Sequence, residues 1–151
     1  MVNMAWLVIA SMMMTGILER IGFIAVLMRM MLRLVGSTGS LIASTMATCF
    51  GVNVLTGDQY MSIVLPGQMW KSEFERRGLA NVNLSRTLED AGTLTSPLIP
   101  WNACGVYMAG TLAVSTIAYL PYCFFNLINP IVSLLFAFMN IKIERLNKAA
   151  G

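Results

Sequence analysis

The sequence carries little charge and no histidine. Only 11% of its 151 residues are charged, whereas a soluble domain has about a quarter. Without histidine, zinc, haem and Ser-His-Asp sites lack their usual ligands or base. The three cysteines, Cys49, Cys104 and Cys123, have no Cys-x-x-Cys spacing and all lie in apolar runs. We therefore expect them to be packing residues, and they indicate no metal or redox centre.

The chain is unusually rich in apolar residues. Apolar residues make up 57% of it, and the mean hydropathy is +0.71. Several long apolar runs favour membrane spans over one oversized soluble core. The net charge of +3 is divided between a loop and the tail, which suits topology control and argues against nucleic acid as a partner. We expect an all-α, polytopic protein surrounded by lipid, with residues 1–151 forming a single transmembrane region.

The N-terminal part predicts two short apolar segments. Residues 4–18 fall short of the roughly twenty that a span needs, and no basic region typical of a signal peptide precedes them. Residues 21–35 carry Arg29 and Arg33 on one helical face. Such side chains can reach the lipid headgroups, so an interfacial helix is expected there.

Residues 36–69 predict either a re-entrant hairpin or a single broken crossing. Their length exceeds one crossing and falls short of two crossings with a turn, at ~1.5 Å per residue. The stretch 51–58, GVNVLTGD, is a poor helix former and would be the hairpin tip, and a second apolar piece ends at Pro66-Gly67. A stripe of small residues would let another helix approach closely. This stripe consists of Gly36, Ser40, Ser44 and Thr48.

Residues 70–90 are the only long hydrophilic stretch, and they predict a solvated loop with some helix. Thr87 and Asp90 have the spacing of a capping box, which would make Asp90 a residue that starts the next helix. On spacing alone, this interpretation of Asp90 is favoured over a functional one.

The C-terminal part predicts two more spans and a basic tail. Residues 103–120 form the first, with a ladder of small residues at Gly105, Ala109 and Ala113. Residues 123–139 form the second, kinked at Asn129-Pro130, and 140–151 are the tail. Four basic residues in the loop at 70–90 and three in the tail would lie on the same, cytoplasmic side, which mildly favours the hairpin.

Two polar stretches, 51–58 and 93–102, interrupt the apolar sequence, each with an aspartate nearby. Pro97 and Pro100 each remove a backbone donor and disfavour helix in the residue before them. Such breaks must face protein or water within a membrane, and secondary transporters bind ions there through carbonyl and side-chain oxygens. A carboxylate beside the ion can neutralise it or take a proton instead. The candidate ion-binding residues are Asn53, Thr56, Asp58, Asp90, Thr93, Thr95, Ser96 and Asn102. The alternative, supported about equally by spacing, is that these polar residues only satisfy one another at caps and kinks.

Several stretches resemble the C-terminal part of NhaC-type Na+/H+ antiporters, a family that also includes sodium-lactate/malate-proton antiporters. They are TGDQY at 56–60, IVLPG at 63–67, LSRTLEDAGTLTSPLIPWN at 84–102, and YLPY with FFNLINP within 119–130. The family motif covers the eight candidates together with Pro97, Pro100 and Trp101.

The resemblance implies a multi-pass secondary transporter of the bacterial cytoplasmic membrane. It implies two inverted repeats, each pairing a re-entrant hairpin with a broken helix, of which this chain holds the second. Na+ and H+ would be the transported ions, with or without an organic acid, and no other cofactor is implied. Because family members are much longer, we expect a fragment that needs the N-terminal half or further copies of itself.

The alternative function is a non-transporting membrane subunit or remnant in which the small-residue ladders only pack helices. An enzyme is not expected. An intramembrane aspartyl protease needs Gly-x-Gly-Asp, and Leu55 stands where the first glycine would be.

Overall fold

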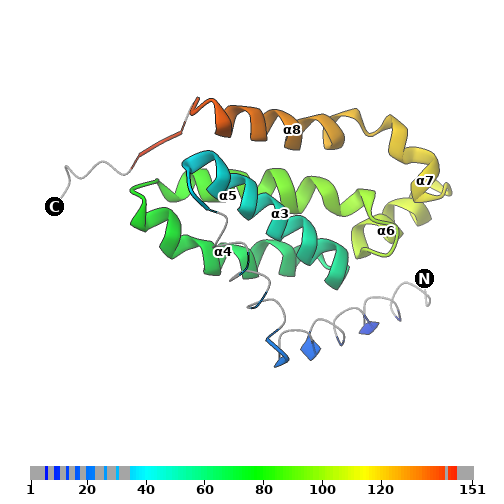
Figure 1. Cartoon of the computed structure of the whole chain (residues 1–151). Helices are drawn as coiled ribbons and strands as arrows, with labels where there is room; N and C mark the ends of the chain where they lie inside the picture. The colour runs from blue at the N-terminus through cyan, green and yellow to red at the C-terminus, as the bar shows by residue number, and fades with distance from the viewer. Residues whose placement is uncertain are drawn as a thin grey trace.

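The computed structural model of the chain describes residues 35–141 and 143–145, and before them residues 6, 9–10, 13, 16–17, 20–22, 26 and 30. The described part is all-helical, and its long helices run side by side in alternating directions (Figure 1). Most of the residues in our predictions for 4–18 and 21–35, Arg29 and Arg33 included, lie outside the described residues. So does most of the tail.

Helices α3 (Thr38–Thr56) and α4 (Gln59–Arg76) pack together as a hairpin. Gly57 ends α3 with φ 65, a left-handed conformation that glycine adopts without strain. Asp58 then begins α4, where its side chain accepts a hydrogen bond of 2.8 Å from the Tyr60 N–H. The expected break at 51–58 is thus narrower than predicted, because residues 51–56 stay helical. Burial of Val52 and Asn53 outweighs the weak helix propensity there.

Helix α4 corrects two predictions. It runs through Pro66, where we expected the apolar piece to end, and it occupies the first part of 70–90, for which we expected a solvated loop with only some helix. The reason is the spacing of Trp70 and Phe74, which lie four residues apart on one helical face and are fully buried. Lys71, Glu75 and Arg76 are exposed, whereas Glu73 is partly buried and pairs with Arg77.

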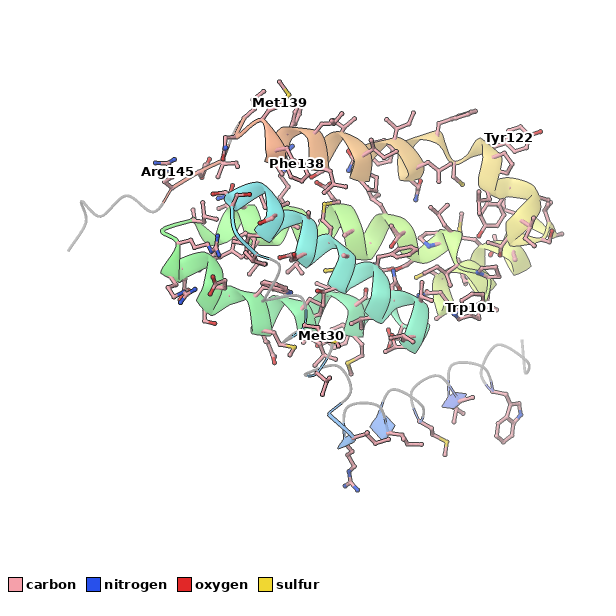
Figure 2. The ribbon with its side chains drawn as sticks, in the orientation of Figure 1. Met30, Trp101, Tyr122, Phe138, Met139 and Arg145 are labelled. Carbon is pink, nitrogen blue, oxygen red and sulfur yellow. The ribbon has the colours of Figure 1, made fainter. Side chains whose placement is uncertain are left out.

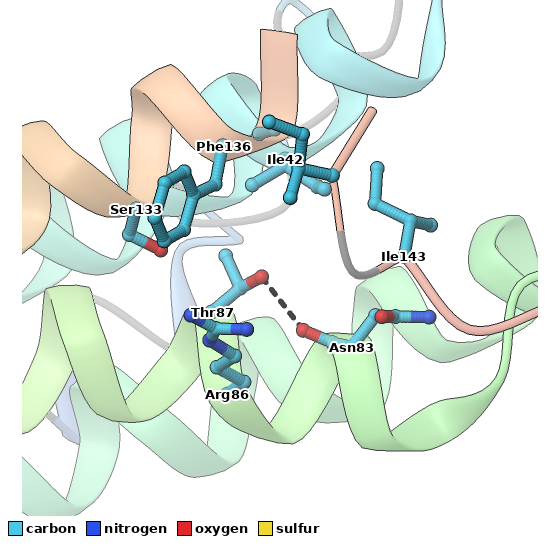
Figure 3. Close-up of a pocket in the computed structure, with 9 residues that line it drawn as sticks. Ile42, Asn83, Arg86, Thr87, Ser133, Phe136 and Ile143 are labelled. Carbon is cyan, nitrogen blue, oxygen red and sulfur yellow. Dashed lines mark hydrogen bonds between the residues drawn. The ribbon is translucent and has the colours of Figure 1, made fainter. Parts of the chain in front are cut away.

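The next segment is a helix that changes its winding. Helix α5 (Asn81–Leu88) continues into the π-helix η1 (Glu89–Thr93), and the 3-10 turn η2 (Ser96–Leu98) follows. The capping interpretation of Thr87 and Asp90 was therefore wrong, because the chain is already helical there. The Thr87 hydroxyl instead donates to the Asn83 carbonyl at 2.7 Å (Figure 3). The predicted break is present and begins at Ser96.

The expected span at 103–120 is bent. It consists of α6 (Ala103–Leu112), α7 (Thr116–Tyr119) and the 3-10 turn η3 (Leu120–Tyr122), and α6 meets 116–122 at 82°. Ala113 adopts φ 53 and is exposed, so it does not extend the small-residue ladder. Gly110 and β-branched residues on both sides of the bend explain the weak helix. Helix α8 (Phe124–Phe138) then continues through Pro130.

One of the described helices, α3, is long and apolar enough to cross a membrane. The bent pair of α6 and residues 116–122 provides a second if the pair counts as one span. Helix α8 is apolar but shorter. Large apolar side chains are exposed on α6, α7, η3 and α8, among them Tyr122 of η3 and Phe138 of α8, and Met139 is exposed just after α8 (Figure 2).

The core lies between α3, α4, α5 and α8. At one end, α3 approaches α8 at Gly39, where a Cβ would lie 3.2 Å from the Phe138 Cα. As we predicted for α3, a small residue allows another helix to approach closely. That residue is Gly39, however, which is not in the predicted stripe. Gly36 precedes the helix, and Ser40 instead takes part in the cap at Ser37.

The residues after α8 form what we call the C-terminal strap, residues 143–145. The strap lies across the turn between α4 and α5, where the Ala80 N–H donates to the Glu144 carbonyl at 3.0 Å. The Asn83 side chain donates to the same carbonyl at 2.6 Å and accepts from the Glu144 N–H at 3.1 Å. A cavity of about 30 Å³ lies beside the strap, lined by α5, α8 and Ile143 (Figure 3). The predicted loop and tail therefore meet at one end of the molecule.

Candidate functional site

Three of the predicted residues converge on a fourth, the buried side chain of Asn53. We call Asn53, Thr95, Ser96 and Asn102 the Asn53 cluster. The Asn53 Nδ2 donates to the Gly92 carbonyl at 2.9 Å, to Thr95 Oγ1 at 3.1 Å and to Ser96 Oγ at 2.8 Å. Its Oδ1 accepts from Asn102 Nδ2 at 2.6 Å and from Ser96 Oγ at 3.1 Å. The cluster thus joins the end of α3 to both sides of the break.

The local sequence explains why the break is polar. Pro97 has no N–H, so the helix cannot continue with its usual hydrogen bonds. Thr95 and Ser96 donate their hydroxyls to the carbonyls of Ala91 and Gly92, four residues earlier. More distant side chains bind carbonyls at the same break, since Asn126 Nδ2 donates to the Leu94 carbonyl at 2.8 Å and the Tyr119 hydroxyl donates to that of Pro97.

The start of α6 is fastened to the end of α3. The Asn102 Oδ1 accepts from the Cys104 N–H at 2.9 Å and so caps α6. The Ala103 N–H donates to the Gly57 carbonyl at 2.9 Å. Trp101 Nε1 donates to the Val54 carbonyl at 2.7 Å. These contacts hold the tip of the α3–α4 hairpin against the far side of the break.

Thr56 and Asp58 lie beside the Asn53 cluster at the turn between α3 and α4. The Thr56 hydroxyl donates to the Val52 carbonyl at 2.8 Å, within its own helix. Asp58 caps α4, as described above. On the other side of the turn, the Cys104 thiol donates to Gln59 Oε1 at 2.8 Å. The turn therefore borders the Asn53 cluster.

Asp90 lies on a different face of η1, toward α8. Its Oδ1 accepts from Asn129 Nδ2 at 2.7 Å, and its Oδ2 is 3.9 Å from Arg86 Nε. The side chain is 15% exposed. Thr93 is half-buried and takes no part in either group. The structure thus separates seven of the eight predicted residues into the Asn53 cluster, the α3–α4 turn, and Asp90 with its own partners, and it leaves Thr93 outside these groups.

Sequence reasoning missed several residues that contribute to these groups. The Gly92 carbonyl accepts from both Asn53 and Ser96, although a backbone atom leaves no mark on a sequence. Asn126 and Asn129 are three residues apart, so they share a helical face. That spacing could have identified them as partners of the break.

In the Asn53 cluster, the hydrogen-bond acceptors outnumber the hydrogens that can be donated to them. The Asn53 amide has two hydrogens for three acceptors, and Ser96 has one for two. The Gly92 carbonyl, Thr95 Oγ1 and Ser96 Oγ all lie within hydrogen-bond distance of the Asn53 amide. Such a group of neutral oxygens is what a hard cation prefers. Within the described part of the chain, no cluster of histidine, cysteine or acidic side chains could hold a metal ion.

The sequence profile of the Na+/H+ antiporter family matches residues 1–141. The chain belongs to the Na+/H+ antiporter family. The Na+/H+ antiporter NhaC of Alkalihalophilus pseudofirmus is 44% identical to it over 146 residues, which are 95% of this chain and 32% of the relative. The NhaC of Bacillus subtilis is 44% identical over 82% of the chain and 27% of the relative. The malate-2H+/Na+-lactate antiporter of Bacillus subtilis is 34% identical over 75% of the chain and 24% of the relative.

Membership of the Na+/H+ antiporter family makes the chain a membrane protein, in agreement with the apolar length of α3. The relatives are named as transporters and not as enzymes. The chain spans less than a third of the length of each of these three relatives. No solved structure matches it.

Proposed function

We propose that this chain contributes to Na+/H+ antiport across the bacterial cytoplasmic membrane, and that the Asn53 cluster binds the Na+. The observation that carries the proposal is the buried, oxygen-rich cluster where a hairpin tip meets a broken helix. Asn53, Thr95 and Asn102 are each at most 8% exposed. In a membrane, irregular backbone of this kind is found where ions are bound.

In this mechanism the cation and the proton act on the same short segment. Na+ would be held by the Gly92 carbonyl and the side-chain oxygens of the cluster, with Thr56 and Asp58 bordering the site at the hairpin tip. Asp90, two residues before Gly92, would take up the proton. Both events then act on the π-helix η1, and π-helices occur often at functional sites.

The proposed architecture is the second of two inverted repeats, with α3 and α4 as a re-entrant hairpin and the segment from α5 to α6 as the broken helix. Further membrane-spanning segments, from an N-terminal half or from another copy of the chain, would complete the path. An organic acid as a co-substrate is suggested only by the name of the malate-2H+/Na+-lactate relative.

The test is pH-driven uptake of 22Na+ into everted vesicles from cells without their own antiporters. The cells would express this chain alone or with a segment that supplies the N-terminal half. We expect uptake that Asn53→Ala abolishes and that Asn81→Ala leaves unchanged, because Asn81 is exposed on α5 and remote from the break. Equal uptake in Asn53→Ala and in the unaltered chain would contradict the proposed site.

A second candidate is a non-transporting membrane subunit. It is favoured by the observation that the polar side chains of the Asn53 cluster serve as hydrogen-bond partners for one another. Titration of Na+ against the purified chain, followed by 23Na NMR, separates the two candidates. If the chain broadens the 23Na signal and Asn53→Ala removes the broadening, the result supports the transporter. If the chain does not change the 23Na signal, the result supports the subunit.

A further inference from the structure

Arg86 on α5 makes few contacts for a half-buried cation. Its side chain is 48% exposed, and its ion pair with Asp90 is a loose one, because 3.9 Å between Nε and Oδ2 is beyond hydrogen-bond distance. Among the described residues, the guanidinium donates no hydrogen bond, although it has five N–H groups to offer. Arginine is well suited to bind a phosphate, because its planar N–H groups match two of the phosphate oxygens.

Two adjoining cavities lie beside Arg86, at the C-terminal strap. The smaller is the cavity of about 30 Å³ described above (Figure 3). The larger, of about 320 Å³, is at the lower end of the volumes of small-molecule sites. Asn83, Arg86 and Ile143 line both cavities. Val82 and Glu144 complete the lining of the larger one.

The larger cavity therefore has one residue of each charge sign in its lining, Arg86 from α5 and Glu144 from the strap. The Glu144 backbone is fixed by its hydrogen bonds with Ala80 and Asn83. Its side chain is different, since Glu144 is exposed and its carboxylate has no hydrogen bond or ion pair within the described part of the chain. A ligand with an anionic and a cationic group a few bonds apart is complementary to such a pair.

Exposed apolar side chains flank the two cavities. Val82, which lines the larger, is 61% exposed, and Ile141, which lines the smaller, is 40% exposed. The apolar surface continues along α8, where Leu135 and Phe138 are exposed. A phospholipid matches both parts of this surface, because its headgroup is charged and its acyl chains are apolar. Pockets with basic residues on membrane proteins bind lipid headgroups in this way.

We propose that the cavity at the strap binds the headgroup of phosphatidylethanolamine, with the phosphate at Arg86 and the ammonium at Glu144. The acyl chains lie along Val82, Ile141 and the exposed face of α8. A primary ammonium offers three N–H donors to a carboxylate, which the trimethylated headgroup of phosphatidylcholine lacks. Phosphatidylglycerol has no cationic group for Glu144. The bound headgroup connects α5 to the strap, so the lipid stabilises this end of the molecule.

The test is binding of dioctanoyl-phosphatidylethanolamine to the purified, delipidated chain in detergent, with bound lipid counted by native mass spectrometry. We expect Arg86→Gln to weaken binding about tenfold, the effect of losing a hydrogen-bonded contact to a charged group. Arg145→Gln is the matched control, because it removes the same charge from an exposed strap residue outside the cavity lining and leaves binding unchanged.

The ammonium half of the site is tested with Glu144→Gln. This variant keeps the backbone contacts of the strap, so we expect it to fold and to bind the ethanolamine lipid no more tightly than dioctanoyl-phosphatidylcholine. The unaltered chain should prefer the ethanolamine lipid. If Arg86→Gln does not fold, Arg86→Lys keeps the charge, loses the planar group of donors, and should still bind the lipid more weakly.

Three results would overturn the site. Equal affinity of the unaltered chain and the Arg86 variants would exclude Arg86 as the phosphate ligand. A preference for phosphatidylglycerol would identify an anionic lipid, with no role for Glu144. Equally tight binding of glycerophosphoethanolamine, which has the headgroup and no acyl chains, would identify a soluble phosphate ester and exclude a lipid.

Discussion

At the scale of single residues, Asn53 connects more of the fold than any other side chain of the break. Its amide contacts one backbone carbonyl and three polar side chains, all of them drawn from the segment between Gly92 and Asn102. A buried amide left without partners costs about 1–3 kcal/mol for each unmade hydrogen bond. The same side chain therefore organises the break and, in the proposed function, offers the cation an oxygen.

Gly105 is the residue where the break tolerates no side chain. A Cβ at this position would meet the carbonyl oxygen of Ile99 and lie 3.0 Å from its carbon. Because the obstacle is backbone, we expect Gly105→Ala to lower the free energy of unfolding by about 3 kcal/mol. Denaturation in detergent, followed by circular dichroism, measures it. Gly36→Ala is the control, since nothing lies within 4 Å of a Cβ there. Equal stability of the two variants would refute the close approach.

The sequence named the four residues of the Asn53 cluster among its eight candidates, but it indicated neither their hydrogen bonds to one another nor the position of Asp90. Proline spacing marks a break, and polar residues on either side of a break tend to meet, so Asn53, Ser96 and Asn102 could be identified. Asp90 could not, because the π-helix η1 inserts an extra residue per turn and changes which face each side chain occupies. No property of the residues themselves predicts that winding.

At the scale of elements, helix ends were the least predictable feature. Residues 51–56 and Pro66 lie inside helices, while Ala113 lies at a helix end. In the first two cases burial of neighbouring side chains offsets poor propensity. In the last, the exposed position of Ala113 offers no packing that would keep the helix straight.

The C-terminal end of α4 predicts an acid-sensitive contact. Arg77 Nε donates to Glu73 Oε1 at 2.8 Å, and Arg76 Nη2 donates at 2.9 Å to the same oxygen. The hydrogen bond from Arg77 lowers the pKa of Glu73, with a smaller contribution from Arg76. Because the pKa is lowered on folding, the stabilisation is complete above the unfolded value of about 4.3 and is lost as pH falls through the folded value.

We therefore expect Glu73→Gln to weaken the acid dependence of unfolding and to lower stability at neutral pH. Acid titration followed by circular dichroism measures both effects. Glu75→Gln is the matched control. The Glu75 side chain is 45% exposed, and its distance of 4.0 Å from Lys71 is too long for a strong ion pair. If the acid dependence of unfolding were the same in Glu73→Gln as in the unaltered chain, the contact would contribute nothing to stability.

The C-terminal strap predicts a local change in protease sensitivity. Asn83 pairs with both backbone groups of Glu144 and so holds the strap without regard to its side chains. Losing these two bonds costs about 2 kcal/mol, which corresponds to roughly 30-fold more frequent opening. We expect Asn83→Ala to accelerate trypsin cleavage after Arg145 accordingly, with Asn81→Ala as the control. Cleavage at equal rates would mean that the strap is held by other contacts.

At the scale of the whole molecule, the contacts of the strap bear on orientation. The turn after α4 and residue 144 touch, so the basic stretches around them share one end, while α7 lies at the other (Figure 1). From the positive-inside rule we expect the basic end to face the cytoplasm. In a chain whose native cysteines are replaced, Glu75→Cys and Arg145→Cys should react with an impermeant maleimide from the cytoplasmic side. Ser115→Cys should react from the opposite side.

Two outcomes of this labelling would contradict different statements. Reaction of positions 75 and 145 from opposite sides would contradict the contact between the strap and the α4–α5 turn. Reaction of both from the outer side would leave the fold intact and contradict the orientation.

During synthesis of the chain, Asn53 is made well before its hydrogen-bond partners. Its partners follow it by 39 to 49 positions in the chain. A ribosome adding about 5–20 residues per second needs roughly 2–10 s to produce the last of them. During that interval α3 enters the membrane with an amide whose eventual partners do not yet exist. The order and speed of synthesis, and not only the finished contacts, therefore determine whether α3 stays in the bilayer until the break arrives to complete it.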